Sequence, residues 1–292
     1  MEKGDRIALT AFLWAAVLGG GNVVAVKFSN FELHPLWGAS IRFVLAASVL
    51  WGIVLVRKKV LPTGRRLLLS MGYGLLFFGF GFAFAFYALV DLDPGFASII
   101  LATGPLLTLL FAVAHGQERL RLWPVIGSLS AVAGITVMST VSVDSEIPVL
   151  SILAMVGAAA CFSEASVIAR GIMPIDPSSL NAVGMTAGAI GLLAGALAVR
   201  APFVVPEELE TWTAMAYMVM FGSVVLFNLA AIALKYWDAS RVAYILVLMP
   251  IVAVLLSVWI LDEKVGVGLI GGGILVLTGV YIGALRRSNP GT

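Results

Sequence analysis

Two ionisable side chains lie inside long apolar stretches of this chain, where they could bind a charged ligand or carry a proton. Arg42 falls about 10 Å from one face of a bilayer, counted at the helical rise per residue. An unpaired arginine inside lipid costs about 2.5–3.5 kcal/mol on insertion scales, so Arg42 must pair, face water or extend to the interface. Glu164 lies about 25 Å from the same face, too far along the bilayer normal to touch Arg42.

Glu164 is the one acidic residue within any of these apolar stretches. A carboxyl group in a low-dielectric site has a raised proton affinity, which makes Glu164 a candidate proton carrier. The alternative is a carboxylate that reaches a base at the interface, among Arg170, Arg6 and Lys235. His115, at the end of another apolar stretch, is interpreted as an interfacial side chain, with a proton relay as the alternative.

Five uncharged polar side chains in the apolar stretches could orient a small ligand: Asn22, Thr103, Ser163, Asn228 and Tyr244. The competing interpretation is that they join helices, at about 1 kcal/mol each. Phenylalanine alternates with glycine or alanine over residues 78–86. In a helix this run spreads its rings around most of the surface. Some rings then face lipid, and others could line a cavity suited to aromatic or other apolar ligands.

Two prolines are expected near the middle of the bilayer. Pro105 and Pro250 each fall about 11 residues into an apolar stretch, or about 16 Å deep. Because proline has no N–H, the carbonyl groups of Leu101 and Leu246 would lack their helical donors. Such carbonyls could face a central cavity and accept from a substrate amino group. Alternatively, a nearby hydroxyl such as that of Thr103 satisfies them.

The elements that must position these residues are membrane-spanning helices. The 292 residues are 61% hydrophobic and 12% charged, with a mean hydropathy of +1.05, whereas about a quarter of the residues of a soluble domain are charged. The fold class is therefore an all-α integral membrane protein. Ten crossings are expected at about residues 7–28, 35–56, 67–90, 94–115, 121–140, 148–171, 177–199, 212–234, 239–260 and 265–286.

A pattern in the first half of the chain returns in the second half without insertion or deletion. Asp93, Pro105, Glu118, Gly127 and Gly134 correspond to Asp238, Pro250, Glu263, Gly272 and Gly279, and each pair is 145 positions apart. The predicted domains are residues 1–142 and 143–292, with five helices each. Because five is odd, the second copy enters the bilayer from the opposite side. Inverted repeats of this kind indicate alternating access, although duplication could also simply enlarge a bundle.

Basic residues in the short connections predict that both termini are cytoplasmic. On that side the chain would place Lys3, Arg6, Arg57, Lys58, Lys59, Arg65, Arg66, Arg119, Arg121, Arg170, Lys235, Arg241, Arg286 and Arg287. The outer side would hold only Lys27, Arg200 and Lys264. The single cysteine, Cys161, excludes an internal disulfide.

Several of these residues together resemble a known family. They are three glycines before Asn22, then Lys27, Pro35, Arg42-Phe43 and a Pro94 to Ser98 segment that leads to Pro105 and Glu118. Weaker counterparts in the second half are Asp238 to Ala243, Pro250, Glu263-Lys264 and the basic helix end at Arg170. Over its whole length the chain resembles the drug/metabolite transporter superfamily, specifically the ten-helix EamA-type exporters. Within that group it is most similar to the YddG-type amino-acid exporters.

This resemblance implies export of amino acids, although the superfamily also handles other metabolites, nucleotide sugars and drugs. Its four-helix multidrug relatives carry a glutamate in the first helix, whereas the first stretch here offers only Trp14 and Asn22 as polar interior groups. Cationic drugs are correspondingly less favoured.

The sequence therefore predicts a secondary transporter that exports small metabolites, most of all amino acids including aromatic ones, by alternating access. The site is placed in a cavity at the midplane of the cytoplasmic membrane of a bacterium. The sequence contains no phosphate-binding loop, zinc-protease motif or serine-nucleophile elbow, and we expect no cofactor, metal or nucleic-acid partner. The expected partners are a small-molecule substrate and membrane lipid, and an oligomer is not required. An intramembrane or lipid-modifying enzyme that uses Glu164 or Arg42, and a passive channel, are the alternatives.

Overall fold

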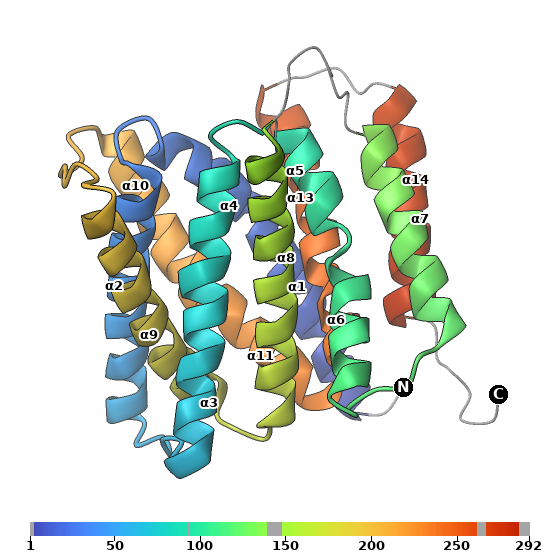
Figure 1. Ribbon diagram of the computed structural model, residues 1–292, viewed down its shortest axis with the longest axis horizontal. Helices are drawn as coiled ribbons and strands as arrows, with labels where there is room; N and C mark the ends of the chain where they lie inside the picture. Colours follow the sequence, from blue (N-terminus) through green and yellow to red (C-terminus); the bar gives the residue numbers. More distant parts are fainter. Residues whose placement is uncertain (1–2, 93, 139–147, 262–266, 286–292) are drawn as a thin grey trace.

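The computed structural model describes residues 3–92, 94–138, 148–261 and 267–285, and the elements of these ranges are all helices (Figure 1). The first half contains α1 (Lys3–Ser29), α2 (Pro35–Val56), α3 (Gly64–Gly74), η1 (Leu75–Gly81), α4 (Phe82–Ala88), α5 (Pro94–Leu101), α6 (Gly104–Ala114) and α7 (Leu122–Met138). The second half contains α8 (Val149–Gly171), α9 (Pro177–Ala198), α10 (Leu209–Val219), η2 (Met220–Val225), α11 (Leu226–Tyr236), α12 (Ala239–Val242), α13 (Tyr244–Leu261), α14 (Val267–Val280) and η3 (Tyr281–Leu285).

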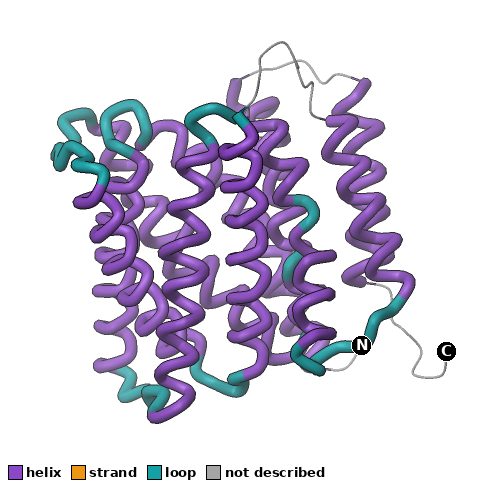
Figure 2. The backbone as a smooth tube through the Cα atoms, in the orientation of Figure 1, coloured by secondary structure: helices purple, strands orange, loops and turns teal. Residues whose placement is uncertain are grey.

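The predicted all-α membrane architecture is confirmed. Some crossings consist of several consecutive elements. Helices α3, η1 and α4 form one crossing, and α10, η2 and α11 form another. With the pairs α5–α6, α12–α13 and α14–η3, the described chain forms ten helical units (Figure 2). Six are long and apolar enough to cross a membrane: Pro35–Val56, Gly64–Ala88, Ala97–Ala114, Val149–Gly171, Pro177–Ala198 and Leu209–Tyr236. Shorter apolar helices cover Leu122–Val137, Ala239–Ala253 and Gly271–Leu285.

The fourth crossing differs from the expected continuous helix. The sequence analysis placed Pro105 in the middle of a helix, but α5 ends at Leu101 and α6 begins at Gly104. Pro105 therefore lies in the first turn of α6, where a missing N–H removes no helical hydrogen bond. The amide of Thr103 instead closes a tighter turn on the carbonyl oxygen of Ile100, at 3.0 Å.

The ninth crossing keeps its proline inside the helix. Pro250 lies within α13, as expected, and the chain bends earlier, at Ala243 between α12 and α13. The carbonyl group of Leu246 therefore faces a residue without an N–H at its usual donor position. The two copies of the pattern thus use equivalent prolines differently, one to begin a helix and one inside a helix.

Both halves contain a π-helix at the same place in the repeat. Leu75 begins η1 and Met220 begins η2, and these residues are 145 positions apart, the spacing of the repeat. A π-helix shifts the backbone hydrogen bonds by one residue and is found frequently at functional sites. The helix faces that η1 and η2 turn towards the rest of the bundle are therefore candidate positions for a functional site.

Glycines hold the two halves together at two contacts. The first lies between α7 and α14, which run side by side at one edge of the bundle (Figure 1). There a Cβ atom on Gly127 would come 2.7 Å from the carbonyl oxygen of Gly279, and one on Gly134 would come 2.7 Å from that of Gly272. The second contact packs α9 against α3 and η1. Close backbone approach of this kind is typical of small residues between membrane helices.

Candidate functional site

Arg42 joins the two halves of the molecule at η2. Its Nε donates to Ser223 Oγ at 2.8 Å, and its Nη2 donates to the carbonyl oxygen of Gly222 at 2.8 Å. Only 2% of the arginine is exposed, although it lies well inside α2. Arg42 therefore pairs with neutral oxygen atoms, and in the described part of the chain it takes part in no ion pair.

Aromatic rings surround one side of this arginine. Its guanidinium carbon lies 5.0 Å from the ring centre of Phe43 and 5.7 Å from that of Phe82, distances at which a ring face attracts a cation. These two rings belong to a phenylalanine cluster in which each ring lies within about 5.5 Å of another. The cluster comprises Phe43, Phe77, Phe78, Phe82, Phe162 and Phe227. Because Phe162 and Phe227 come from the second half, the cluster also spans both halves.

Asn22 approaches the same turn of η2 from α1. Its Oδ1 is buried and has no hydrogen-bond partner among the residues that the structure describes. A Cβ atom on Gly222 would overlap this amide, so the absence of a side chain at Gly222 leaves the space that Asn22 occupies. An unpaired buried acceptor usually costs about 1–3 kcal/mol, which makes Asn22 a candidate for binding a donor from a ligand.

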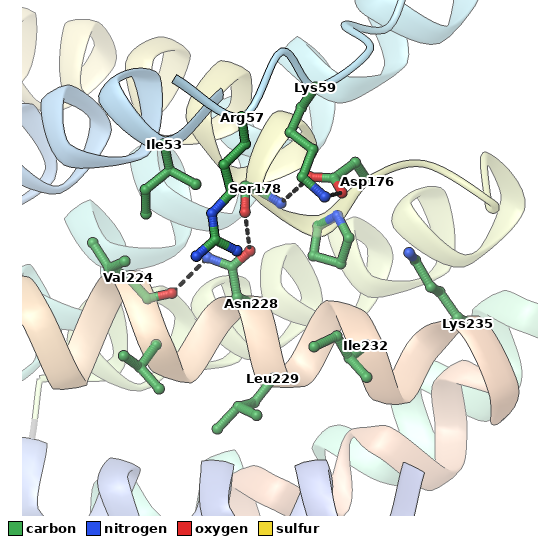
Figure 3. Close-up of a pocket in the computed structure, with 12 residues that line it drawn as sticks. Ile53, Arg57, Lys59, Asp176, Ser178, Val224, Asn228, Leu229, Ile232 and Lys235 are labelled. Carbon is green, nitrogen blue, oxygen red and sulfur yellow. Dashed lines mark hydrogen bonds and ion pairs between the residues drawn. The ribbon is translucent and has the colours of Figure 1, made fainter. Parts of the chain in front are cut away.

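A cavity of about 410 Å³ lies between α2, α9 and α11, at the end of the bundle where the basic connections gather (Figure 3). Arg57, Lys59 and Lys235 line it together with Asp176 and Asn228. Asn228 accepts from Ser178 Oγ at 3.1 Å and donates to the carbonyl oxygen of Val224 at 2.6 Å. Figure 3 shows Arg57 reaching from the end of α2 towards Asn228. The charged side chains that line the cavity are thus predominantly basic, and they come from the ends of α2, α9 and α11.

Asp176 fixes one wall of this cavity because it begins α9. Its Oδ1 accepts from the backbone N–H groups of Ser178 and Ser179, and its Oδ2 accepts from Lys59 Nζ at 2.9 Å. Burial raises the pKa of Asp176, but the hydrogen bond and charge of Lys59 and the two N–H groups outweigh burial, so the pKa lies below its usual value. The stabilisation by this carboxylate is therefore present above the usual carboxyl pKa and is lost as the pH falls through the lowered pKa.

Asp176→Ala is expected to lower the free energy of unfolding by about 1 kcal/mol, because helix α9 loses its N-cap. Unfolding of the purified protein in detergent at neutral pH measures the loss. Lys59→Met leaves the cap in place and removes only a partly exposed ion pair, so we expect about half the effect or less. Equal losses in the two variants would show that the ion pair, and not the cap, holds this wall.

Glu164 pairs with His115. Glu164 Oε1 of α8 lies 3.3 Å from His115 Nε2 at the end of α6, rather than beside Arg170, Arg6 or Lys235. Both side chains are partly exposed, and His115 also lines a second cavity of about 360 Å³ with Arg65 and Gln117. The pair joins the two halves at the end of the bundle that carries the basic residues, and it is an ion pair only when the histidine is protonated.

Two hydroxyl candidates bind the backbone around the break in the fourth crossing. Thr103 Oγ1 donates to the carbonyl oxygen of Ile100 at 2.6 Å, and Ser163 Oγ donates to that of Gly104 at 3.2 Å. Ser163 is buried and comes from α8, so its hydrogen bond crosses between the halves. Both hydroxyls thus bind backbone carbonyl groups beside Pro105, where the helix of the fourth crossing is interrupted.

Tyr244 lies away from the Arg42 site. The side chain is fully buried, and its hydroxyl bonds to Ser128 Oγ and to the carbonyl oxygen of Pro124, each at 3.1 Å. Its ring also fills the space that a side chain on Gly283 would need. Tyr244 thus fastens the start of α13 to α7 and η3, and it shares none of these contacts with Asn22, Arg42 or Ser163.

The sequence analysis recognised Glu118 as a repeat landmark but assigned it no contact. Its carboxylate accepts from both the backbone N–H and the hydroxyl of Ser240, at the start of α12 in the other half. Burial raises the pKa of Glu118, against the lowering effect of these two hydrogen bonds. Glu118 and Asp238, just before the start of α12, are both landmarks of the repeat. Their recurrence in both copies was the signal in the sequence that could have indicated this contact.

At the opposite end of the bundle the loop after α1 is fastened to the loop before α10. Glu32 accepts from the N–H groups of Glu207 and Glu208, and Trp37 Nε1 donates to the carbonyl oxygen of Val204 at 2.8 Å. The hydrogen bond from Thr211, with those from the two backbone amides, lowers the pKa of Glu32. The two halves therefore also touch at this end, close to the start of α2, with Arg42 further along the same helix.

Comparison with known proteins places this arrangement in a family. The sequence profile of the EamA-like transporter family matches residues 6–140 and again residues 149–284. The inner membrane transporter YedA of Escherichia coli (strain K12), itself named as uncharacterized, is 27% identical over 82% of this chain and 78% of its own length. A probable amino-acid metabolite efflux pump of the same strain is 25% identical over 92% of both chains.

The fold has a match among solved structures. A protein crystal structure superimposes with a TM-score of 0.81 at 22% sequence identity, and the match covers 95% of this chain and 96% of the other. The family and relatives that match are transporters and not enzymes. With two matched segments that together span most of its length, the chain belongs to the EamA-like transporter family and is a membrane transporter.

Proposed function

We propose that this transporter exports small metabolites, most of all amino acids including aromatic ones, by alternating access between two inverted halves, residues 1–142 and 143–292. The relatives named above include a protein named as a probable amino-acid metabolite efflux pump, which supports the substrate class. The phenylalanine cluster and Arg42, both shared between the halves, support a site at their junction.

The observation that carries the mechanism is the reciprocal contact between the equivalent helices α7 and α14. Gly127 lies against Gly279, and Gly134 lies against Gly272, so each of the two glycines of α7 meets the equivalent of the other. Ser130 Oγ donates to the carbonyl oxygen of Leu275 at 3.0 Å, and these two residues are themselves 145 positions apart. Contact between equivalent residues is expected on a twofold axis, and an axis in the membrane plane relates inverted repeats.

The cavities at the basic end of the bundle favour one direction of access. Three cavities of about 350–410 Å³ open at the end that carries Arg6, Arg57, Lys59 and Arg65, which the charge distribution places in the cytoplasm. Contacts connect the halves at both ends, through Glu164 and His115 at this end and through Glu32 and Trp37 at the other. α1 begins and η3 ends at the basic end, where Arg241 Nε donates to the carbonyl oxygen of Ala284 and Trp237 Nε1 to Asp5. This arrangement fits an exporter with cytoplasmic termini that loads substrate from the cytoplasm.

Counterflow of radiolabelled amino acids in proteoliposomes tests the proposal. Unlabelled substrate inside should drive saturable accumulation of labelled substrate, which leaves the vesicles chemically unchanged. A chemically altered product without flux would identify an intramembrane enzyme. Flux that neither saturates nor shows counterflow would identify a channel.

Glu164→Gln is expected to abolish any stimulation of export by a pH gradient, because the amide cannot carry a proton between α8 and His115. Efflux with and without the gradient measures this effect. Glu210→Gln, an exposed carboxyl in the first turn of α10, is the matched control and should keep the stimulation. Unchanged stimulation in Glu164→Gln would exclude this carboxyl as the proton carrier.

A further inference from the structure

The contact between Arg42 and η2 uses only some of the hydrogen-bond donors of the guanidinium and does not neutralise its charge. The guanidinium has five N–H donors, of which Nε and Nη2 each donate one hydrogen bond, so three N–H groups have no acceptor among the residues that the structure describes. Its acceptors are a hydroxyl and a carbonyl, which carry no neutralising charge. A buried cation without an anion is costly and marks a functional position in membrane proteins.

The other half of the molecule shows that the same helix pair can pack without a charge. Helices α2 and α9 begin at Pro35 and Pro177, 142 positions apart, so the equivalent of Arg42 in α9 is Gly184. Gly184 packs against Tyr73 and Gly74 of α3, and one turn further on a side chain at Gly188 would collide with Phe78 of η1. Apolar packing therefore holds α9 on η1, whereas α2 meets η2 through a cation. The cation at position 42 is thus explained by a ligand rather than by helix association.

The groups around Arg42 have the chemistry of a zwitterion site. Unused guanidinium N–H groups donate to a carboxylate, for which the planar fork of arginine is well suited. The unpaired Oδ1 of Asn22, on the other side of Gly222, accepts from an ammonium group. Phe43 and Phe82 beside the guanidinium lead into the phenylalanine cluster, which offers an apolar surface.

We propose that Arg42 binds the carboxylate of the exported substrate and Asn22 its ammonium group, with the substrate side chain against the phenylalanine cluster. The substrate class is then an α-amino acid with an apolar or aromatic side chain. This inference rests on the proposed export function and specifies the residues that recognise the substrate. The carboxylate supplies the anion that Arg42 lacks, so the site prefers acids over their amides and amines.

Ligand binding by the purified wild-type protein tests this preference without any substitution. L-Phenylalanine and L-leucine should raise the melting temperature in detergent, whereas L-phenylalaninamide and phenethylamine, which lack the carboxylate, should bind at least about tenfold more weakly. Equal binding of the acid and the amide would overturn the proposal, as would no binding of either amino acid.

Variants of Arg42 then assign the preference to this residue. Arg42→Met should lose about tenfold or more in affinity for L-phenylalanine and should no longer distinguish it from the amide. Arg42→Lys, which keeps the charge but not the fork, should keep a reduced preference and remains informative if Arg42→Met does not fold. Arg241→Met is the matched control, because Arg241 also lies over a ring and donates to a backbone carbonyl; it should keep the full preference.

Counterflow on the same proteins separates this inference from the proposed function. Wild-type flux of L-phenylalanine with an unchanged acid preference in both Arg42 variants would overturn the assignment to Arg42 and leave export in place. Arg42-dependent binding of L-phenylalanine without flux of any amino acid would support the site and overturn export.

Discussion

Gly74→Ala is expected to destabilise the protein more than any other single methyl addition in α3, at the upper end of about 1–3 kcal/mol. The added Cβ atom would overlap the carbonyl oxygen and Cα atom of Gly184, so backbone and not a flexible side chain blocks it. Because interiors are close-packed, α9 must move away from α3 and η1, which carry part of the phenylalanine cluster. The melting temperature in detergent and the amount of folded protein in membranes measure the effect.

Gly72→Ala is the matched control in the same helix, two residues away. A Cβ atom at Gly72 meets nothing within 4 Å, and alanine has the higher helix propensity, so this variant should be neutral or slightly more stable. If the two variants lost the same stability, helix α3 itself would be sensitive to alanine and the close contact with Gly184 would not be the cause.

Glu118→Ala is expected to lower the free energy of unfolding by about 1–3 kcal/mol, because it leaves the N–H and hydroxyl groups of Ser240 without their acceptor. The same contact connects the end of the fourth crossing to the start of the ninth, so we also expect export to fall several-fold. Unfolding in detergent and counterflow measure the two effects. Full stability and full counterflow would contradict a structural role for this contact.

Glu118→Gln separates the hydrogen bonds from the charge, because the amide oxygen still accepts from Ser240. Burial raises the pKa of Glu118, so the stability that its carboxyl contributes is fully present below the usual carboxyl pKa and is lost as the pH rises through the raised pKa. The glutamine variant should therefore lose less stability than the alanine variant and should show a weaker decline as the pH rises through that window. A decline as steep as that of the wild-type protein would assign the pH dependence to another group.

The pattern of the sequence was sufficient to predict the architecture. Long apolar stretches dictate helices in lipid, since a helix is the one open element that satisfies its own backbone there. The constant spacing of 145 residues between landmarks such as Gly134 and Gly279 predicted the duplication, and the family profile matches each half separately. Both signals are local or periodic, so they can be read without knowing which helices touch.

The sequence could not predict which groups the polar residues contact, because those groups come from remote positions in the chain. Arg42 was expected to need a partner, but its acceptors, Gly222 and Ser223, lie 180 and 181 positions away in a π-helix that no local propensity indicates. Glu164 was similarly matched with three bases expected at the interface, Arg170, Arg6 and Lys235, whereas it is His115 that lies opposite it.

The sequence by itself determined the medium, the helices and the twofold repetition, because hydrophobicity and spacing act along the chain. Only the tertiary structure decided that Pro105 begins a helix while Pro250 stays inside one, and that Asn22 and Arg42 meet at one glycine. Those outcomes depend on which atoms of different helices approach within hydrogen-bond distance, and that is set by the packing of the two halves and not by either half alone.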